Sequence, residues 1–247
     1  MTSGKIRWIH QVTENDVWNG NCLQSQSSRD PAARDPAVCP DETAPDNDFP
    51  DSPSLVELKG GRQVVIAGNK AGLLLALDPD HKGRTIWRQR VGKGLFDGGV
   101  MWGAAVDGEN LYAANADFYR ENPSASGGMA AVELVGGRII WTMMPPPCGD
   151  RKPCKPSQAA AVTAIPGVVF SGTMDGQLRA YSTLDGNIIW EYESAREYTT
   201  VNGVKANGGS MSNGGPAVVG GMLFVNSGYS HHGGVIPGNV LLAFSVK

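Results

Sequence analysis

The sequence lacks several features that would assign a chain quickly to a large class of proteins. No apolar run approaches the roughly 18 residues that a membrane-spanning helix requires. No cluster of Lys and Arg offers a surface for nucleic acid, and the formal net charge is -3. A Ser/His/Asp arrangement, a phosphate-binding glycine loop and a CxxCH haem motif are also absent. We therefore expect no membrane span and no nucleic-acid partner.

Cysteine is scarce, and its spacing is not that of a zinc site. Cys22 pairs locally with Cys39, and Cys148 with Cys154, and each pair brackets a polar loop rich in Pro. Because neither spacing is CxxC and no His lies nearby, we prefer two disulfides to zinc. Disulfides predict an oxidising compartment. Since residues 1–5 do not open a signal peptide, we expect the natural N-terminus to differ from the one shown.

What the sequence has in abundance is glycine, with 33 Gly and 16 Pro among 247 residues. Short apolar runs separated by such residues favour an all-β fold with many turns. The stretch 169–190 is typical, because Asp175-Gly176 and Asp185-Gly186 each predict a tight turn between two strands. Two consecutive hairpins make one small antiparallel sheet, which needs stacked neighbours to bury its apolar faces.

The same order of strand, turn, strand, Gly and Trp recurs along the chain. Trp87, Trp141 and Trp190 lie 54 and 49 residues apart, a period typical of four-stranded propeller blades. A β-sandwich would leave this recurrence to coincidence. We therefore predict one β-propeller domain over residues 1–247, with about four blades at 54–87, 100–141, 158–190 and 210–247.

The last predicted blade has no closing Gly and Trp, whereas residues 4–8 (GKIRW) echo the closing segment of the others. We expect residues 4–9 to supply the closing strand of the last blade. Two architectures follow. Either four blades close into a small ring, or the chain is about half of a larger ring. A homodimer would be a third way to complete an eight-bladed ring.

The segment from Leu178 to Trp190 resembles the repeat of dehydrogenases that depend on pyrroloquinoline quinone (PQQ). Longer segments resemble the polyvinyl alcohol dehydrogenase branch of that family: 4–22, 91–103, 157–175 and 202–244. The resemblance implies a C-terminal portion of a periplasmic quinoprotein with an eight-bladed propeller. Such enzymes oxidise secondary alcohols, small or polymeric, with PQQ and calcium, and pass electrons to a cytochrome c.

The resemblance also implies a set of cofactor-binding residues. Lys70 occupies the place of a basic residue beside the reactive quinone oxygen, where it could stabilise negative charge. Trp102, flanked by glycines on a predicted inner strand, offers a flat platform. Asn115 and Asp117 follow a strand where the family places an amide contact. Asn202 and Lys205 lie in a glycine-rich loop suited to carboxylate binding.

The same resemblance leaves the catalytic machinery incomplete. In the family, the catalytic Asp and the calcium ligands precede the stretch that residues 4–8 match. We therefore assign no catalytic residue and no metal ligand, and we expect the isolated chain to be inactive. The alternative function is a non-catalytic PQQ-like repeat scaffold for protein contacts in the cell envelope.

Overall fold

The computed structural model describes residues 4–17, 46–94, 98–117, 126–229 and 235–246. Within these ranges every regular element is a β-strand, in agreement with the all-β prediction. The described part of the chain contains no helix of the length and apolar character needed to cross a bilayer.

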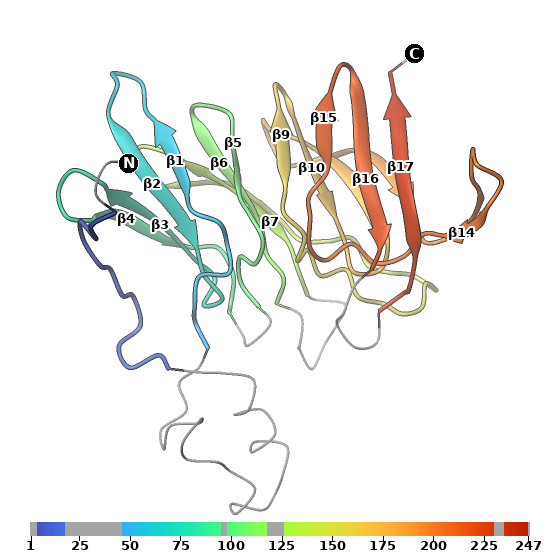
Figure 1. Cartoon of the computed structure of the whole chain (residues 1–247), viewed down its shortest axis with the longest axis horizontal. Coiled ribbons are helices and arrows are strands. Elements are labelled where there is room, and N and C mark those ends of the chain that lie inside the picture. The colour runs from blue at the N-terminus through green and yellow to red at the C-terminus, as the bar shows by residue number, and fades with distance from the viewer. Residues whose placement is uncertain (1–3, 18–45, 95–97, 118–125, 230–234, 247) are drawn as a thin grey trace, which may run out of the picture.

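Three four-stranded antiparallel sheets and one three-stranded sheet stand side by side in chain order (Figure 1). The first sheet contains β1 (Ser54–Glu57), β2 (Gln63–Gly68), β3 (Leu73–Asp78) and β4 (Arg84–Arg90). The second contains β5 (Ala105–Val106), β6 (Asn110–Ala114), β7 (Met129–Glu133) and β8 (Ile139–Met143). We call the four sheets blades 1 to 4 in chain order, so these two are blades 1 and 2.

Blade 3 contains β9 (Thr163–Ile165), β10 (Val168–Gly172), β11 (Gln177–Ser182) and β12 (Ile188–Glu193). Blade 4 contains β15 (Ala217–Val219), β16 (Met222–Gly228) and β17 (Asn239–Ser245). After blade 3 in the chain, β13 (Glu197–Thr199) and β14 (Lys205–Asn207) form a hairpin, and β14 lies beyond β17 at the edge of the array (Figure 1). The strands β5, β9 and β15 contact one another in turn, so blades 2 to 4 meet along their first strands.

Apolar side chains fill the spaces between successive blades. Leu74 and Trp87 of blade 1 belong to one buried cluster with Leu111 and Val132 of blade 2. A second cluster joins blades 2 and 3, and a third joins blades 3 and 4. Each sheet therefore buries one face against the next sheet, which is the packing that a propeller requires. The predicted fold class is confirmed.

In blades 1 and 2, a tryptophan on the outer strand packs on a glycine of the next blade. The indole N–H of Trp87 donates to the carbonyl of Leu134 at 2.8 Å, and that of Trp141 donates to the carbonyl of Thr183 at 3.0 Å. A Cβ atom added to Gly137 or Gly186 would lie 2.6 Å from the indole that covers it. Glycine is required here because any side chain would displace the ring.

Trp8 makes the same contact with blade 1. Its indole N–H donates to the carbonyl of Pro79 at 3.2 Å, and a Cβ on Gly83 would lie 2.6 Å from its ring. Residues 4–9 therefore lie beside blade 1 and are not paired with β17 of the same chain, contrary to the expected closure. The docking of Trp8 does not itself decide the closure, because Trp87 and Trp141 also dock on the blade that follows their own.

We predict that Gly186→Ala destabilises the protein more than Gly60→Ala does. Both glycines have positive φ, but a Cβ at Gly60 meets open space whereas one at Gly186 meets Trp141. The overlap should cost about 1–3 kcal/mol beyond the backbone strain that both variants share. Chemical denaturation of the two variants measures the difference. Equal losses of stability would contradict the docking role of the glycine.

Candidate functional site

One end of the blade array collects the connections between blades and the turns between the second and third strands. We call this end the loop face, and it is the lower side in Figure 1. Its connections are residues 98–104, 157–162 and 208–216, and its turns include 69–72 and 173–176. Lys70, Trp102, Asn115 and Asp117 all belong to this face.

Gly99 joins the segments that carry these four residues. Its carbonyl accepts a hydrogen bond from Ala116 N at 2.8 Å, and the next amide, Val100 N, donates to the carbonyl of Asn69 at 3.1 Å. A Cβ at Gly99 would lie 2.5 Å from the backbone of the turn 69–72. The structure thus brings together the turn of Lys70, the connection of Trp102 and the strand end of Asn115.

Lys70 is not a solvated turn lysine, because two carboxylates hold its ammonium group. Lys70 Nζ lies 3.0 Å from Asp46 and 2.9 Å from Asp48, and the lysine side chain is 13% exposed. The carboxylate of Asp16 in turn accepts hydrogen bonds from the amides of Asp46 and Asn47. These groups line a cavity of about 270 Å³.

For both Lys70 and Asp46, burial and ion pairing shift the pKa in opposite directions. Burial lowers the pKa of Lys70, but hydrogen bonds to Asp48 and Asp46 outweigh it and the net pKa is raised. For Asp46, burial dominates and raises the pKa to about 6 in spite of Lys70. Lys70 therefore stays protonated at neutral pH, as a group that stabilises negative charge must.

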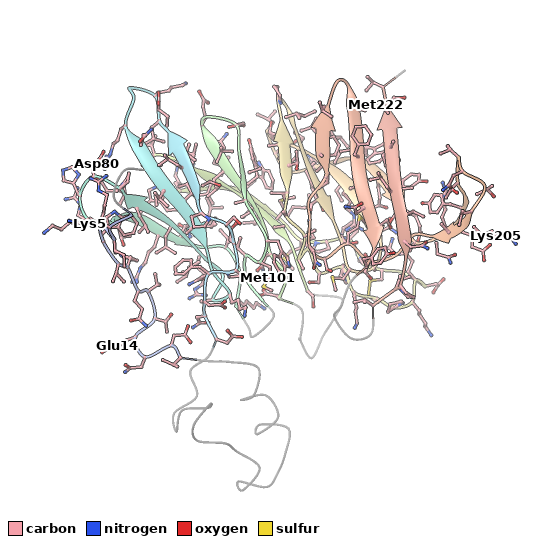
Figure 2. The ribbon with its side chains drawn as sticks, viewed as in Figure 1. Lys5, Glu14, Asp80, Met101, Lys205 and Met222 are labelled. Atoms are coloured by element: carbon pink, nitrogen blue, oxygen red, sulfur yellow. A yellow bond between two sulfur atoms is a disulfide. The ribbon has the colours of Figure 1, made fainter. Side chains whose placement is uncertain are left out.

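Trp102 presents part of its ring to solvent on the loop face. It is 38% exposed, whereas its neighbour Met101, labelled in Figure 2, is buried. The prediction placed Trp102 on an inner strand, but it lies in the connection before β5. An exposed indole on a connection held by Gly99 can serve as a stacking surface for a flat ligand.

Asp117 has a clear role in the protein itself. Its carboxylate accepts hydrogen bonds from the amides of Lys93, Gly94 and Gly99 and from the side-chain amide of Asn115. Asp117 therefore fixes the connection between blades 1 and 2. The side-chain oxygen of Asn115 is buried and has no hydrogen-bond partner among the described residues, so Asn115 keeps an unused acceptor.

Asn202 and Lys205 do not join this group. Lys205 begins β14, and Asn202 lies in the turn of the same outward hairpin. Figure 2 shows Lys205 at one extreme of the molecule, far from Met101. The prediction read the stretch as a loop before an inner strand, whereas short β-pairing of β13 with β14 turns it outward.

The Cys148–Cys154 pairing is confirmed. The two residues form a disulfide with an S–S distance of 2.08 Å. Cys148 also lies near Asp175, whose carboxylate pairs with Arg151 at 3.3 Å, so the disulfide holds its loop against the loop-face turn of blade 3. The predicted partners Cys22 and Cys39 lie outside the described residues.

Asp51 is a buried carboxylate that sequence reasoning missed. It is 4% exposed and lies between blades 1 and 2, within reach of Gly68 and Gly103. Burial raises its pKa to about 6, opposed by hydrogen bonds from the backbone of Gly68 and Ala104. One of its oxygens has no hydrogen-bond partner among the described residues. Its position, two residues beyond Phe49 in a Pro-rich connection, gave no signal in the sequence.

Two further features bear on the choice of site. The described residues contain no group of three or more His, Cys, Asp and Glu side chains that could hold a metal ion. A larger hollow, of about 760 Å³, lies at the opposite end of the blades among the turns around residues 57–59, 106–109 and 164–166. It contains none of the predicted site residues, so the loop face is the candidate site.

Comparison with protein families gives a match over residues 70–239 to the PQQ_2 model, described as outer membrane protein assembly factor BamB. The chain belongs to this PQQ-type repeat family. The polyvinylalcohol dehydrogenase of a Pseudomonas species is 41% identical over 99% of the chain, and that of Sphingopyxis strain 113P3 is 32% identical over 99%. The chain spans 38% of the length of each relative.

Solved propellers show weaker likeness. BamB from Moraxella catarrhalis is 17% identical, with a TM-score of 0.46 over 73% of this chain and 47% of that one. A europium-containing methanol dehydrogenase is 16% identical, with a TM-score of 0.48 over 76% of this chain and 40% of that one.

We predict that Asp51→Asn stabilises the protein at pH 7 and leaves its stability at pH 4 unchanged. The folded-state pKa of Asp51 is raised from 3.8 to about 6, so its stabilising contribution is present below pH 4 and is lost as pH rises through 6. The neutral amide should remove a penalty on the order of 2 kcal/mol at pH 7. Thermal unfolding at both pH values measures it.

Asp80→Asn is the matched control, because Asp80 is exposed in a turn of blade 1 and its charge is not buried. It should change stability little at either pH. A destabilised Asp51→Asn at pH 7 would show that the buried carboxylate is held in its charged form.

Proposed function

We propose that this chain is part of a PQQ-dependent dehydrogenase that oxidises alcohols, as the names of its relatives suggest. The observation that carries the proposal is the joint at Gly99. It places an ion-paired lysine and a partly exposed tryptophan on one face of a PQQ-type propeller. Similarity to polyvinylalcohol dehydrogenases over 99% of the chain supports the same function.

The residues on the loop face fit one side of a PQQ site. PQQ is a flat quinone with three carboxylates, so it requires an aromatic or apolar platform and cationic or amide partners. Trp102 would supply the platform and Lys70 the cation. The unpartnered oxygen of Asn115 would accept a hydrogen bond only from a donor, such as the pyrrole N–H of PQQ. When bound, PQQ supplies a carbonyl that accepts a hydride from an alcohol. Lys70 would hold positive charge beside that carbonyl.

Calcium does not fit the described residues, because they offer no cluster of carboxylates of the kind that binds it. We derive no step through calcium for this chain. The proposal assigns the calcium ligands and the catalytic base to other parts of a complete ring, so the isolated chain should be inactive. It further includes secondary alcohols as substrates, a periplasmic location and a cytochrome c acceptor.

We predict that the 247-residue chain binds PQQ and that Lys70→Ala weakens this binding at least tenfold, since the cation is lost. Trp102→Ala should weaken it similarly through loss of stacking. Isothermal titration with PQQ measures both effects. Lys70→Arg should retain most of the affinity, because the guanidinium keeps the charge beside Asp46 and Asp48.

Lys205→Ala is the control, because it removes an exposed lysine on the outward hairpin. It should leave PQQ affinity unchanged. A loss of affinity in Lys205→Ala alone would move the site to the hairpin. No binding of PQQ by the chain at any concentration would contradict the cofactor proposal and favour a repeat scaffold that acts through protein contacts.

A further inference from the structure

Blade 3 holds a charged side chain in its interior that the candidate site does not use. Arg179 lies on β11, and its side chain is completely buried. Its Nε donates to the carboxylate of Glu191 on the neighbouring strand β12. Its terminal nitrogens, Nη1 and Nη2, are buried and have no hydrogen-bond partner among the described residues. Since a guanidinium has five N–H groups, most of the donors of Arg179 are unused.

Other buried polar atoms without a described partner lie around Arg179. They are Gln177 Nε2, the Tyr181 hydroxyl and Gln158 Oε1, and each of these residues is at most 2% exposed. Gln177, Arg179 and Tyr181 alternate along β11, so their side chains leave the same face of the strand. Gln158 joins them from the connection between blades 2 and 3, because its Nε2 donates to Ser171, which pairs with Arg179 across the sheet. We call the following side chains the buried polar cluster: Gln158, Gln177, Arg179 and Tyr181.

The buried polar cluster faces blade 2. Tyr181 belongs to the apolar cluster that joins blades 2 and 3, whereas Leu178, on the opposite face of β11, packs toward blade 4. Among the described side chains that blade 2 contributes to that apolar cluster, Tyr112 and Trp141 alone have a nitrogen or oxygen atom. The hydroxyl of Tyr112 and the indole N–H of Trp141 both donate elsewhere. These side chains therefore supply no acceptor to the buried polar cluster.

Charge and protonation make the buried polar cluster mainly a set of donors. Burial raises the pKa of Tyr181. Arg179 and Gln158 lie near its hydroxyl and oppose this shift, although neither is in hydrogen-bonding geometry with it. The hydroxyl therefore keeps its proton at neutral pH and can donate, as the guanidinium and the amide of Gln177 do. A water molecule must donate as well as accept, whereas an anion only accepts, so the surplus of donors favours an anion.

We propose that the buried polar cluster binds one small inorganic anion, such as chloride, between blades 2 and 3. Glu191 occupies the Nε side of the guanidinium, so both Nη atoms of Arg179 can donate to the anion. Gln177 and Tyr181 add further hydrogen bonds. The anion thereby satisfies buried donors that would otherwise each lower the stability of the fold. The inference concerns how blade 3 packs on blade 2 and does not depend on PQQ.

Chemical unfolding of the 247-residue chain in sodium chloride and in sodium gluconate of equal ionic strength tests the proposal. Gluconate is too large to replace chloride in a buried site. Above the dissociation constant, each tenfold rise in chloride should raise the folding equilibrium constant about tenfold, because the anion binds only the folded chain. Sodium bromide should act as sodium chloride does. Equal stability in chloride and gluconate at every concentration would overturn the proposal.

Two Tyr→Phe variants separate the site from general effects of salt. Tyr181→Phe removes one donor and keeps the ring, so it should weaken chloride affinity about tenfold. Tyr112→Phe is the matched control, because Tyr112 is equally buried in the same apolar cluster but its hydroxyl donates to Asp107. It should lower the stability and leave the chloride dependence unchanged. General salt effects act on both variants alike, so an equal change of chloride dependence in both would contradict the site.

A crystal structure of the unmodified chain grown in sodium bromide locates the anion, because bromide scatters anomalously. We expect an anomalous peak within hydrogen-bond distance of the Nη atoms of Arg179 and of the Tyr181 hydroxyl. Ordered water at that place without an anomalous peak would overturn the proposal, since the donors would then be hydrated. Bromide confined to exposed lysines and arginines would overturn it equally, as an adventitious ion only.

Discussion

The contact of an indole with a bare glycine is the interaction on which this structure depends. A Trp ring can lie flat against the backbone of the next blade only where no Cβ intervenes, and its N–H then reaches a carbonyl three residues before the glycine, as at Trp87 and Gly137. The contact combines burial of a large apolar surface with a directed hydrogen bond. It therefore fixes both the separation and the relative orientation of neighbouring sheets.

The candidate site depends on this separation and orientation of neighbouring blades. Because the blades are held in a fixed relation at their outer strands, their inter-blade connections meet near the axis on one face. There Gly99 bridges the turn of Lys70 and the strand end of Asn115, and Asp117 fixes the connection that carries Trp102. Exact placement of Trp102 and Lys70 thus rests on hydrogen bonds that are made by the protein alone. A flat ligand would meet a surface that is already formed.

Much of the fold was predictable because its signals are local. Each Gly-x-x-x-Trp segment and each Asp-Gly turn predicts a hairpin within about twenty residues. The regular recurrence of these segments along the chain then indicates the blades. The site was less predictable because its decisive contacts join distant residues. Nothing near Lys70 in the sequence indicates that Asp46 and Asp48 hold its charge. The burial of Asp51 depends likewise on two blades packing around it.

The differences between expectation and structure have the same origin. Residues 4–8 repeat the closing Gly-x-x-x-Trp segment of the blades, but the sequence alone does not indicate which blade Trp8 contacts, and the structure places it on blade 1. Lys205 has the right chemistry for a carboxylate ligand, but the pairing of β13 with β14 carries it away from the axis. Local patterns thus specify the parts of this propeller, whereas the partner of each part depends on the packing between blades.

The measurement that tests the account most directly is a crystal structure of the chain grown with PQQ. The account predicts the quinone stacked on Trp102 on the loop face, with Lys70 at its edge. Density for PQQ confined to another surface, with Trp102 and Lys70 uncovered, would contradict it.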